Sequence, residues 1–540
     1  PPLTASEPPA RLGPEVCFLG GCGGCARNLP IPESPSETRC KNFFQPARSS
    51  RRICVCARIP IDFPAFQSIF IGAASKASGG ATGDFMRSAQ QALDRDFSLF
   101  GQLRFVSPRI GMSLFIMSYL VADGVLIAHY LGTTALAALN LTFPIAGVMS
   151  AGGIMLSSGG SSVVSRRLGA DRLEDAHSAF TTILWAEAIL GALLGFFGWL
   201  FMDPLFAFLG IDDELVPLAA AYQAVVFLGQ PLLLLSFAVQ TFFTTAGYPK
   251  FGLYSSIASG VTNVVLDIFF MGPLEMGMAG AAWATVISWF VTGLTGVAFF
   301  GRKNAPLQFR RGVFEWRAIK NAVTSGFAEM VSSLSHAVTL FLFNRAFKGM
   351  LGIDGVAALT IASYSTYVFN SVFYGFSEAT AAIIGFKYGR KDWAGLKKVF
   401  GNAAKTALAF SGLSFLLSIL FYEPVLAVFT APGTNVYAIV AGSFTLYATT
   451  LLFSGSNMFA AYFFTAFGDG RRAAILSFCR TFLFMILAIE TLPLLLGEPG
   501  LWLALPASEC LSFATALVFI VTNARRYGYD GRPALLIREG

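Results

Sequence analysis

The sequence places an acidic side chain inside an apolar stretch, SYLVADGVLIAHYLG, which covers residues 118–132 with Asp123 near its middle. An ionisable group at the centre of a membrane-spanning helix costs about 2.5 kcal/mol or more, so such groups usually face a bundle interior and carry function. A carboxyl that is protonated on one side of a membrane and ionised on the other couples transport to a proton gradient. Asp123 is therefore a candidate coupling group.

A second set of polar groups lies in two later apolar stretches. Asn263 and Asp267 are four residues apart, so they share one face of the helix expected there. Thr285 adds a hydroxyl within the segment GAAWATVIS. Such oxygens suit a proton relay or a dehydrated Na⁺, which prefers oxygen ligands. A purely structural polar cluster between helices is the alternative.

Other polar residues inside apolar stretches are weaker candidates. They are expected either to line a central cleft or to hydrogen-bond neighbouring helices, and they are Glu187, Gln240, Glu378, Asn344 and Asn457. The apolar stretches contain no HExxH, GxSxG or P-loop motif and no set of metal ligands. The sequence therefore predicts neither an enzyme nor a metal centre.

The composition indicates what positions these groups. Hydrophobic residues make up 55% of the chain and charged residues 13%, with a mean hydropathy of +0.63, whereas soluble domains carry about 25% charged residues. Abundant Phe and Gly, 54 of each, fit helices packed closely in lipid. The expected class is an all-α polytopic membrane protein. The net charge of +7 is interpreted through topology rather than as a nucleic-acid surface.

Long apolar runs alternate with short polar loops and predict twelve transmembrane helices. The runs are continuous, which excludes the alternating pattern of a transmembrane β-barrel. The expected spans are 107–130, 140–165, 178–202, 216–245, 252–273, 278–301, 319–346, 354–384, 399–421, 436–466, 473–496 and 499–522.

Lys and Arg are concentrated in alternate loops, most densely in GRKNAPLQFRRGVFEWRAIK at 301–320, whereas acidic residues dominate the opposite loops. The positive-inside rule places the basic loops and both termini in the cytoplasm. We expect a multi-pass protein of the plasma membrane, the inner membrane in a bacterium.

An internal repeat divides the spans into two halves. LGTTALAALNLTF begins at Leu131, and LGIDGVAALTIAS begins 220 residues later at Leu351. Two six-span units in the same orientation imply a pseudo-twofold axis along the membrane normal, which suits a carrier that works by alternating access. The predicted parts are an N-lobe at 86–301, a cytoplasmic linker at 302–318, a C-lobe at 319–522 and a cytoplasmic tail at 523–540.

Several segments resemble the multidrug and toxic compound extrusion (MATE) transporters, in particular the bacterial branch of DinF-like and MepA-like proteins. They are YLVADGVLIAHYLGTTALAALNLTFPI, GGSSVVSRRLGADRLEDA, GYPK, TNVVLD, GMAGAAWAT, LFLFNRAF and GVAAL, and the resemblance covers roughly 98–522. In that family an Asp of span 1, an Asn and an Asp of span 5 and a Thr of span 6 form an ion site in the N-lobe. The resemblance implies this role for Asp123, Asn263, Asp267 and Thr285.

The chain also departs from the family pattern. Span 10 contains no acid, although one branch of the family has an acid there, and Ala381 and Ala382 stand where the family usually has Gln-Pro. A C-lobe cation site of the kind found in that branch is therefore not expected.

The resemblance implies a secondary exporter of organic, cationic or amphipathic compounds that is driven by H⁺ or Na⁺. A flippase of lipid-linked precursors, or an exporter of one specific metabolite, is the alternative; most basic residues lie in loops, with Arg480 among the few inside expected spans, which disfavours a phosphate-binding cleft. The expected partners are a small organic substrate, the coupling cation and the bilayer, with no nucleic acid and no cofactor. We expect the monomer to function alone.

Residues 1–85 contain no spanning run but hold six of the eight cysteines, including CGGC at 22–25, and precede the first Met at Met86. No second cysteine pair has matching spacing, which argues against a zinc site. The expectation is a disordered or non-native extension; an Arg- and Ser-rich targeting peptide is the alternative.

Overall fold

The computed structural model describes residues 92–535, except 212, 303, 311–313 and 431–432. The predictions for residues 1–85 therefore lie outside the described residues. Helices account for all the regular secondary structure of the described part, and no strand occurs in it.

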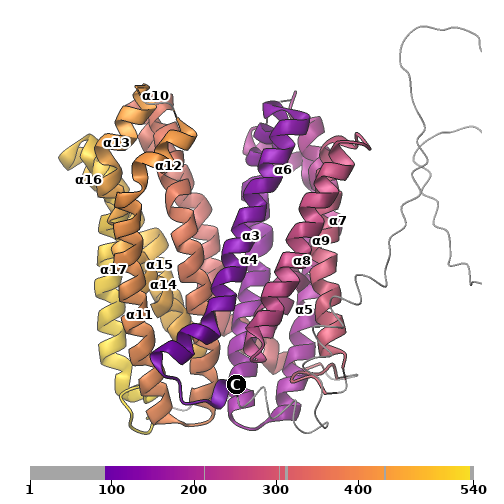
Figure 1. Cartoon of the computed structure of the whole chain (residues 1–540), viewed down its shortest axis with the longest axis vertical. Helices are drawn as coiled ribbons and strands as arrows, with labels where there is room; N and C mark the ends of the chain where they lie inside the picture. The colour runs from indigo at the N-terminus through magenta and orange to yellow at the C-terminus, as the bar shows by residue number, and fades with distance from the viewer. Residues whose placement is uncertain (1–91, 212, 303, 311–313, 431–432, 536–540) are drawn as a thin grey trace, which may run out of the picture. The chain divides into compact units, whose positions relative to one another are not determined.

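The helices form two groups (Figure 1). The first group, called the N-bundle, consists of α3 (Leu99–Leu131), α4 (Thr133–Gly169), α5 (Leu173–Leu200), the short α6 (Met202–Leu209), α7 (Val216–Thr245), α8 (Pro249–Met271) and α9 (Gly277–Phe300). The second group, called the C-bundle, consists of α10 (Trp316–Gly389), α11 (Trp393–Leu420), the short α12 (Tyr422–Phe429), α13 (Asn435–Ala448), α14 (Leu451–Ala466), α15 (Gly470–Phe478), the π-helix η1 (Cys479–Leu483), α16 (Phe484–Leu496) and α17 (Glu498–Tyr527).

The expected architecture of twelve spans in two six-helix lobes is confirmed. Ten described helices are long and apolar enough to cross a membrane, and α13 with α14 make an eleventh, bent by 47° at their junction. The first half of α10, residues 316–351, is the remaining span; it is not among the helices that pass this apolar test.

Two glycines at equivalent positions of the internal repeat interrupt the helices in the same way. Gly132 separates α3 from α4 with φ of 88°, and Gly352 interrupts α10 with φ of 67°. A positive φ of this size favours glycine because it has no Cβ. The predicted spans 319–346 and 354–384 are therefore the two halves of α10.

The expected span 436–466 is a broken helix. The hydroxyl of Thr449 donates to the carbonyl oxygen of Leu446 at 2.6 Å, and the next amides bond three residues back rather than four. Side-chain hydroxyls that compete for backbone partners weaken and bend helices, and a tighter turn at this point separates α13 from α14.

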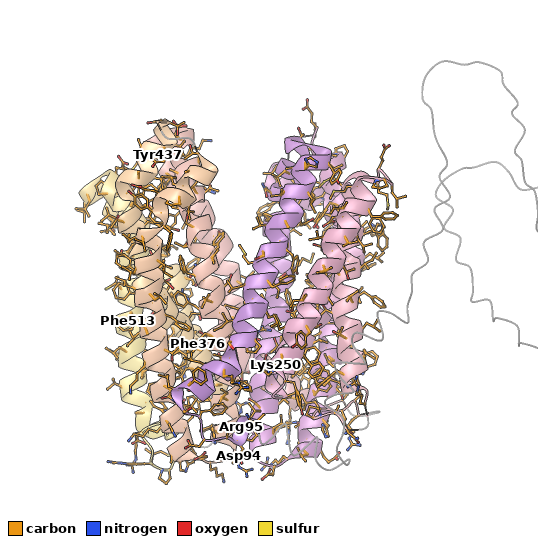
Figure 2. The ribbon with its side chains drawn as sticks, in the orientation of Figure 1. Asp94, Arg95, Lys250, Phe376, Tyr437 and Phe513 are labelled. Carbon is orange, nitrogen blue, oxygen red and sulfur yellow. The ribbon has the colours of Figure 1, made fainter. Side chains whose placement is uncertain are left out.

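Close contact between the bundles is concentrated at one end of the helices. Arg390 Nε lies 3.0 Å from Asp94 Oδ1 and Arg390 Nη1 lies 3.2 Å from Asp171 Oδ2, so the basic loops after α4 and α10 meet there. We call this the basic end; it carries Asp94 and Arg95, whereas Tyr437 lies at the opposite end (Figure 2).

The buried apolar clusters follow the same division. The cluster that draws on both bundles contains residues near the basic end, such as Phe242 and Tyr388. The other three clusters of the described residues each lie within one bundle. Where α4 crosses α10, Gly159 faces the backbone of Ala322 and Gly326 faces that of Met155, so closely that a Cβ on either glycine would overlap a carbonyl. Small residues allow this approach of two helix backbones.

Candidate functional site

Four polar residues that the sequence singles out come together inside the N-bundle. Helix α3 supplies Asp123, α8 supplies Asn263 and Asp267 from one face, and α9 supplies Thr285. Asp123 is 6% exposed and Asp267 is fully buried. These helices pack directly on one another, α8 against both α3 and α9. We call this group, together with the tyrosine described below, the acidic cluster.

The carboxyl groups of Asp123 and Asp267 lie close enough to interact electrostatically. Two carboxylate charges close together in a buried site repel each other, so such a pair favours holding a proton. Beside them, the Asn263 amide donates from Nδ2 to Thr285 Oγ1 at 3.4 Å. The cluster thus brings together two acids from different helices that can bind a proton or a cation between them.

Several oxygens of the acidic cluster receive no hydrogen bond from the surrounding helices. This holds for Asp123 Oδ1, both carboxyl oxygens of Asp267 and Asn263 Oδ1. Buried acceptors without donors are uncommon in native proteins and call for an explanation such as a bound ion. Carboxylate and amide oxygens are also the ligand type that hard cations prefer.

Sequence reasoning missed one member of the acidic cluster. Tyr222 of α7 is buried and its hydroxyl is hydrogen-bonded to Thr285. Tyr119 of α3 also lies near Asp123 and Tyr222. A tyrosine near the end of an apolar span is ordinary in membrane proteins, because Tyr is enriched at both interfaces, so its position alone gave no signal.

Three of the weaker candidates occupy different environments. Glu187 lies buried on α5 and accepts a hydrogen bond from Ser157 of α4 at 2.8 Å. Gln240 is mostly buried on α7. Glu378 joins the two bundles: it is ion-paired with Arg109 of α3 and accepts a hydrogen bond from Thr241 of α7 at 2.8 Å.

The C-bundle holds a separate polar group, the Arg–Glu–Asn triad of Asn457, Arg480 and Glu509. Arg480 donates from Nε to Glu509 Oε1 at 2.9 Å, and Asn457 Nδ2 donates to Glu509 Oε2 at 2.6 Å. Arg480 lies in the π-helix η1, whose carbonyls accept bonds from Thr339 and Ser508. Asn344, the last of the candidates, is half-buried on α10.

Comparison with protein families gives one match in two parts. The family model described as MatE matches residues 108–269 and 330–489. The two matched segments fall in the two bundles, as the internal repeat predicts. They include Asp123, Asn263 and Asp267 but end before the final helix, α17.

Individual relatives and solved structures agree with the family match. The multidrug export protein MepA of Staphylococcus haemolyticus is 24% identical over 460 residues, which cover 82% of this chain and 97% of that protein. An FAD transporter of Shewanella oneidensis is 25% identical over 408 residues, covering 73% and 88%. A structure described as the outward-facing conformation of a multidrug resistance MATE family transporter superposes with a TM-score of 0.74 at 23% identity, covering 81% and 97%.

Proposed function

The chain belongs to the MATE family of membrane transporters, and from this premise we propose that it exports organic, cationic or amphipathic compounds by antiport with H⁺ or Na⁺. The observation that carries the proposal is the pair of carboxyl groups, Asp123 and Asp267, that meet inside the N-bundle. No lysine or arginine side chain of the described residues is ion-paired with either acid. The coupling ion has to supply the missing positive charge.

Coupling follows from the charge balance of the acidic cluster. With one proton bound, the pair carries one negative charge; a second proton or a Na⁺ neutralises it. A neutral cluster is cheaper to bury than a charged one, since charge inside a bilayer is costly. Binding and release of the coupling ion therefore favour different arrangements of α3, α8 and α9.

Alternating access requires that the two bundles separate at one end while they meet at the other. The Arg109–Glu378 ion pair and the bond of 2.6 Å from Ser162 Oγ to the carbonyl of Thr465 join the bundles toward the basic end. With this end in the cytoplasm, as the positive-inside rule favours, these contacts support an outward-open state. Both termini are then cytoplasmic, in a plasma membrane.

The deciding experiment measures transport into proteoliposomes with a proton gradient or a sodium gradient imposed separately. The wild-type protein is expected to respond to one of them. Asp123→Asn keeps the size of the side chain but cannot ionise, so it should fold and lose gradient-driven transport.

The matched control is Glu187→Gln, which removes another buried carboxyl of the same bundle. It should retain gradient-driven transport. Full gradient-driven transport by Asp123→Asn, normalised to folded protein, would contradict the coupling role.

A second candidate function is export of one specific metabolite. The observation that favours it is the similarity to a protein named as an FAD transporter. Competition assays separate the two: a multidrug exporter is inhibited by many unrelated organic cations, whereas a metabolite exporter is inhibited only by close analogues of its substrate.

A further inference from the structure

An open groove runs between two helices of the C-bundle, away from the acidic cluster. It has a volume of about 710 Å³ and lies between the first half of α10 and α15. Pockets of roughly 300–1,000 Å³ hold small-molecule ligands. The residues that define its apolar walls are Val323, Phe327, Val331, Ala474, Ile475 and Phe478. We call it the α10–α15 groove.

The walls of the α10–α15 groove are left uncovered by the protein. Phe327 is 41% exposed, Ile475 40% and Phe478 47%. At Gly470 the two helices approach so closely that a Cβ would overlap the carbonyl of Thr324. Beyond this backbone contact the larger side chains hold the helices apart, and an apolar trough remains.

One basic side chain lines the groove, and a second lies one helical turn before a lining residue. Arg471 lines it in the first turn of α15. Lys320 lies four residues before Thr324, hence on the same face of α10. Both are exposed, and no carboxylate of the described part of the chain is ion-paired with either. The neighbouring Arg472, by contrast, is paired with Asp469.

We propose that the α10–α15 groove binds one anionic phospholipid from the leaflet at the basic end. An acyl chain lies along Phe327, Ile475 and Phe478, and the headgroup phosphate sits between Lys320 and Arg471. Basic pockets between transmembrane helices are a recurrent setting for anionic headgroups. The proposal depends on the membrane fold and the groove, and is independent of how transport is coupled.

Such a lipid would hold together two helices whose own contact is incomplete. The first half of α10 is not among the helices that are apolar enough to count as spans, and α15 begins the span Gly470–Leu496, whose helix is interrupted by the π-helix η1. The bound lipid therefore acts as a structural ligand of the C-bundle.

The headgroup is tested in nanodiscs made from equal parts phosphatidylglycerol and phosphatidylcholine. Native mass spectrometry after detergent release should find one retained phosphatidylglycerol on the wild-type protein. The variant Lys320→Gln/Arg471→Gln should retain it about tenfold less, because two basic contacts to an anionic headgroup are lost.

The matched control for charge is Lys250→Gln/Arg525→Gln. It removes two exposed basic residues elsewhere at the basic end, and Lys250 is labelled in Figure 2. This control should retain the lipid as the wild type does. Equal retention by the groove variant and the control would overturn the proposal, as would equal retention of phosphatidylcholine by the wild type.

The acyl chain is tested by filling the groove. Ile475→Trp should displace the lipid and remove the increase in melting temperature that phosphatidylglycerol gives, whereas Leu413→Trp, on the exposed face of α11, should keep both. If inorganic phosphate alone reproduces the stabilisation, the site binds a free anion rather than a lipid, and the proposal fails.

Discussion

The two bundles each bury a polar group among apolar helices, and they neutralise it differently. In the C-bundle, Glu509 Oε1 accepts a hydrogen bond from Arg480 Nε at 2.9 Å, and Arg480 Nη2 lies 2.8 Å from the same oxygen. In the N-bundle, Asp123 lies beside another acid, Asp267, no cation of the described residues is ion-paired with either, and several oxygens of the pair lack donors. The charge of Glu509 is neutralised by Arg480 of the same protein. The charge of the Asp123–Asp267 pair can be neutralised only by an ion from solution.

The difference separates a structural polar group from an exchangeable one. In a buried ion pair, the attraction between the two charges offsets the cost of removing them from water. An ion from solution therefore gains little binding energy at such a pair. The acid pair has no such partner and is neutralised only by a proton or a cation. The acid pair of the N-bundle is therefore the feature on which the proposed coupling rests.

The repeat shows that the two bundles share a backbone but not this chemistry. Positions 220 residues after Asp123, Asn263 and Asp267 are occupied by Phe343, Leu483 and Leu487. The acidic cluster therefore has no counterpart in the second half, although both halves fold from related sequences.

The largest effect is expected in the acidic cluster itself. Asp123→Asn and Asp267→Asn should each abolish gradient-driven transport in proteoliposomes, and the double variant should be little worse than either single one, since members of one unit are non-additive. Additive losses in this cycle would mean that the two acids act separately.

The second largest effect is expected in the Arg–Glu–Asn triad, and it concerns stability. Arg480→Met leaves Glu509 buried without a counter-charge, which costs about 3–5 kcal/mol in comparable cases. The melting temperature of the purified protein should fall clearly. The double variant Arg480→Met/Glu509→Gln should recover most of the lost melting temperature and should retain ion coupling. Loss of ion coupling in a stable double variant would contradict a purely structural role for the triad.

A smaller effect is expected for the tyrosine that the fold adds to the acidic cluster. Tyr222→Phe removes one hydrogen bond to Thr285, worth about 1 kcal/mol, so the apparent affinity for the coupling ion should fall about fivefold. Tyr119→Phe is the control, because its described contacts include no hydrogen bond to Thr285. The dependence of the transport rate on the concentration of the coupling ion is measured for both variants. If Tyr222→Phe gives the same curve as Tyr119→Phe, Tyr222 is not part of the ion site.

The smallest effect is expected for the ion pair between the buried Lys387 and the partly exposed Asp392. Burial raises the pKa of the Asp392 carboxyl, but hydrogen bonds from Lys387 Nζ at 2.8 Å and from the Gly395 amide lower it more, so the net pKa lies below its ordinary value. A lowered folded-state pKa stabilises above the unfolded pKa, and this stability is lost as pH falls through the folded value.

Asp392→Asn preserves the helix cap of α11 but removes the charge. At pH 7 it should cost at most about 1 kcal/mol, because Asp392 is partly exposed and the buried Lys387 keeps its hydrogen bond to the Asp94 carbonyl at 3.0 Å. Its melting temperature should approach that of the wild type below about pH 4, near the ordinary Asp pKa. A difference that persists unchanged at lower pH would show that the cap, rather than the charge, was disturbed.

The sequence by itself determined the spans and most of the polar residues of the acidic cluster. Apolar length is a local property, and span 216–245 coincides with α7. The cost of an acid in lipid is also local, which is why Asp123 and Asp267 were found without knowing how their helices pack. The repeat supplied the division into two bundles.

Only the tertiary structure decided which polar groups meet. Tyr222 joins Thr285 from another helix, and Arg480 finds Glu509 through a π-helix that no periodicity signals. The break between α13 and α14 was likewise not predicted. These features depend on which faces of two helices pack together, although the helices are far apart in the sequence. Helices that are apolar on nearly all sides show little periodicity, so the sequence does not indicate which face packs against which neighbour.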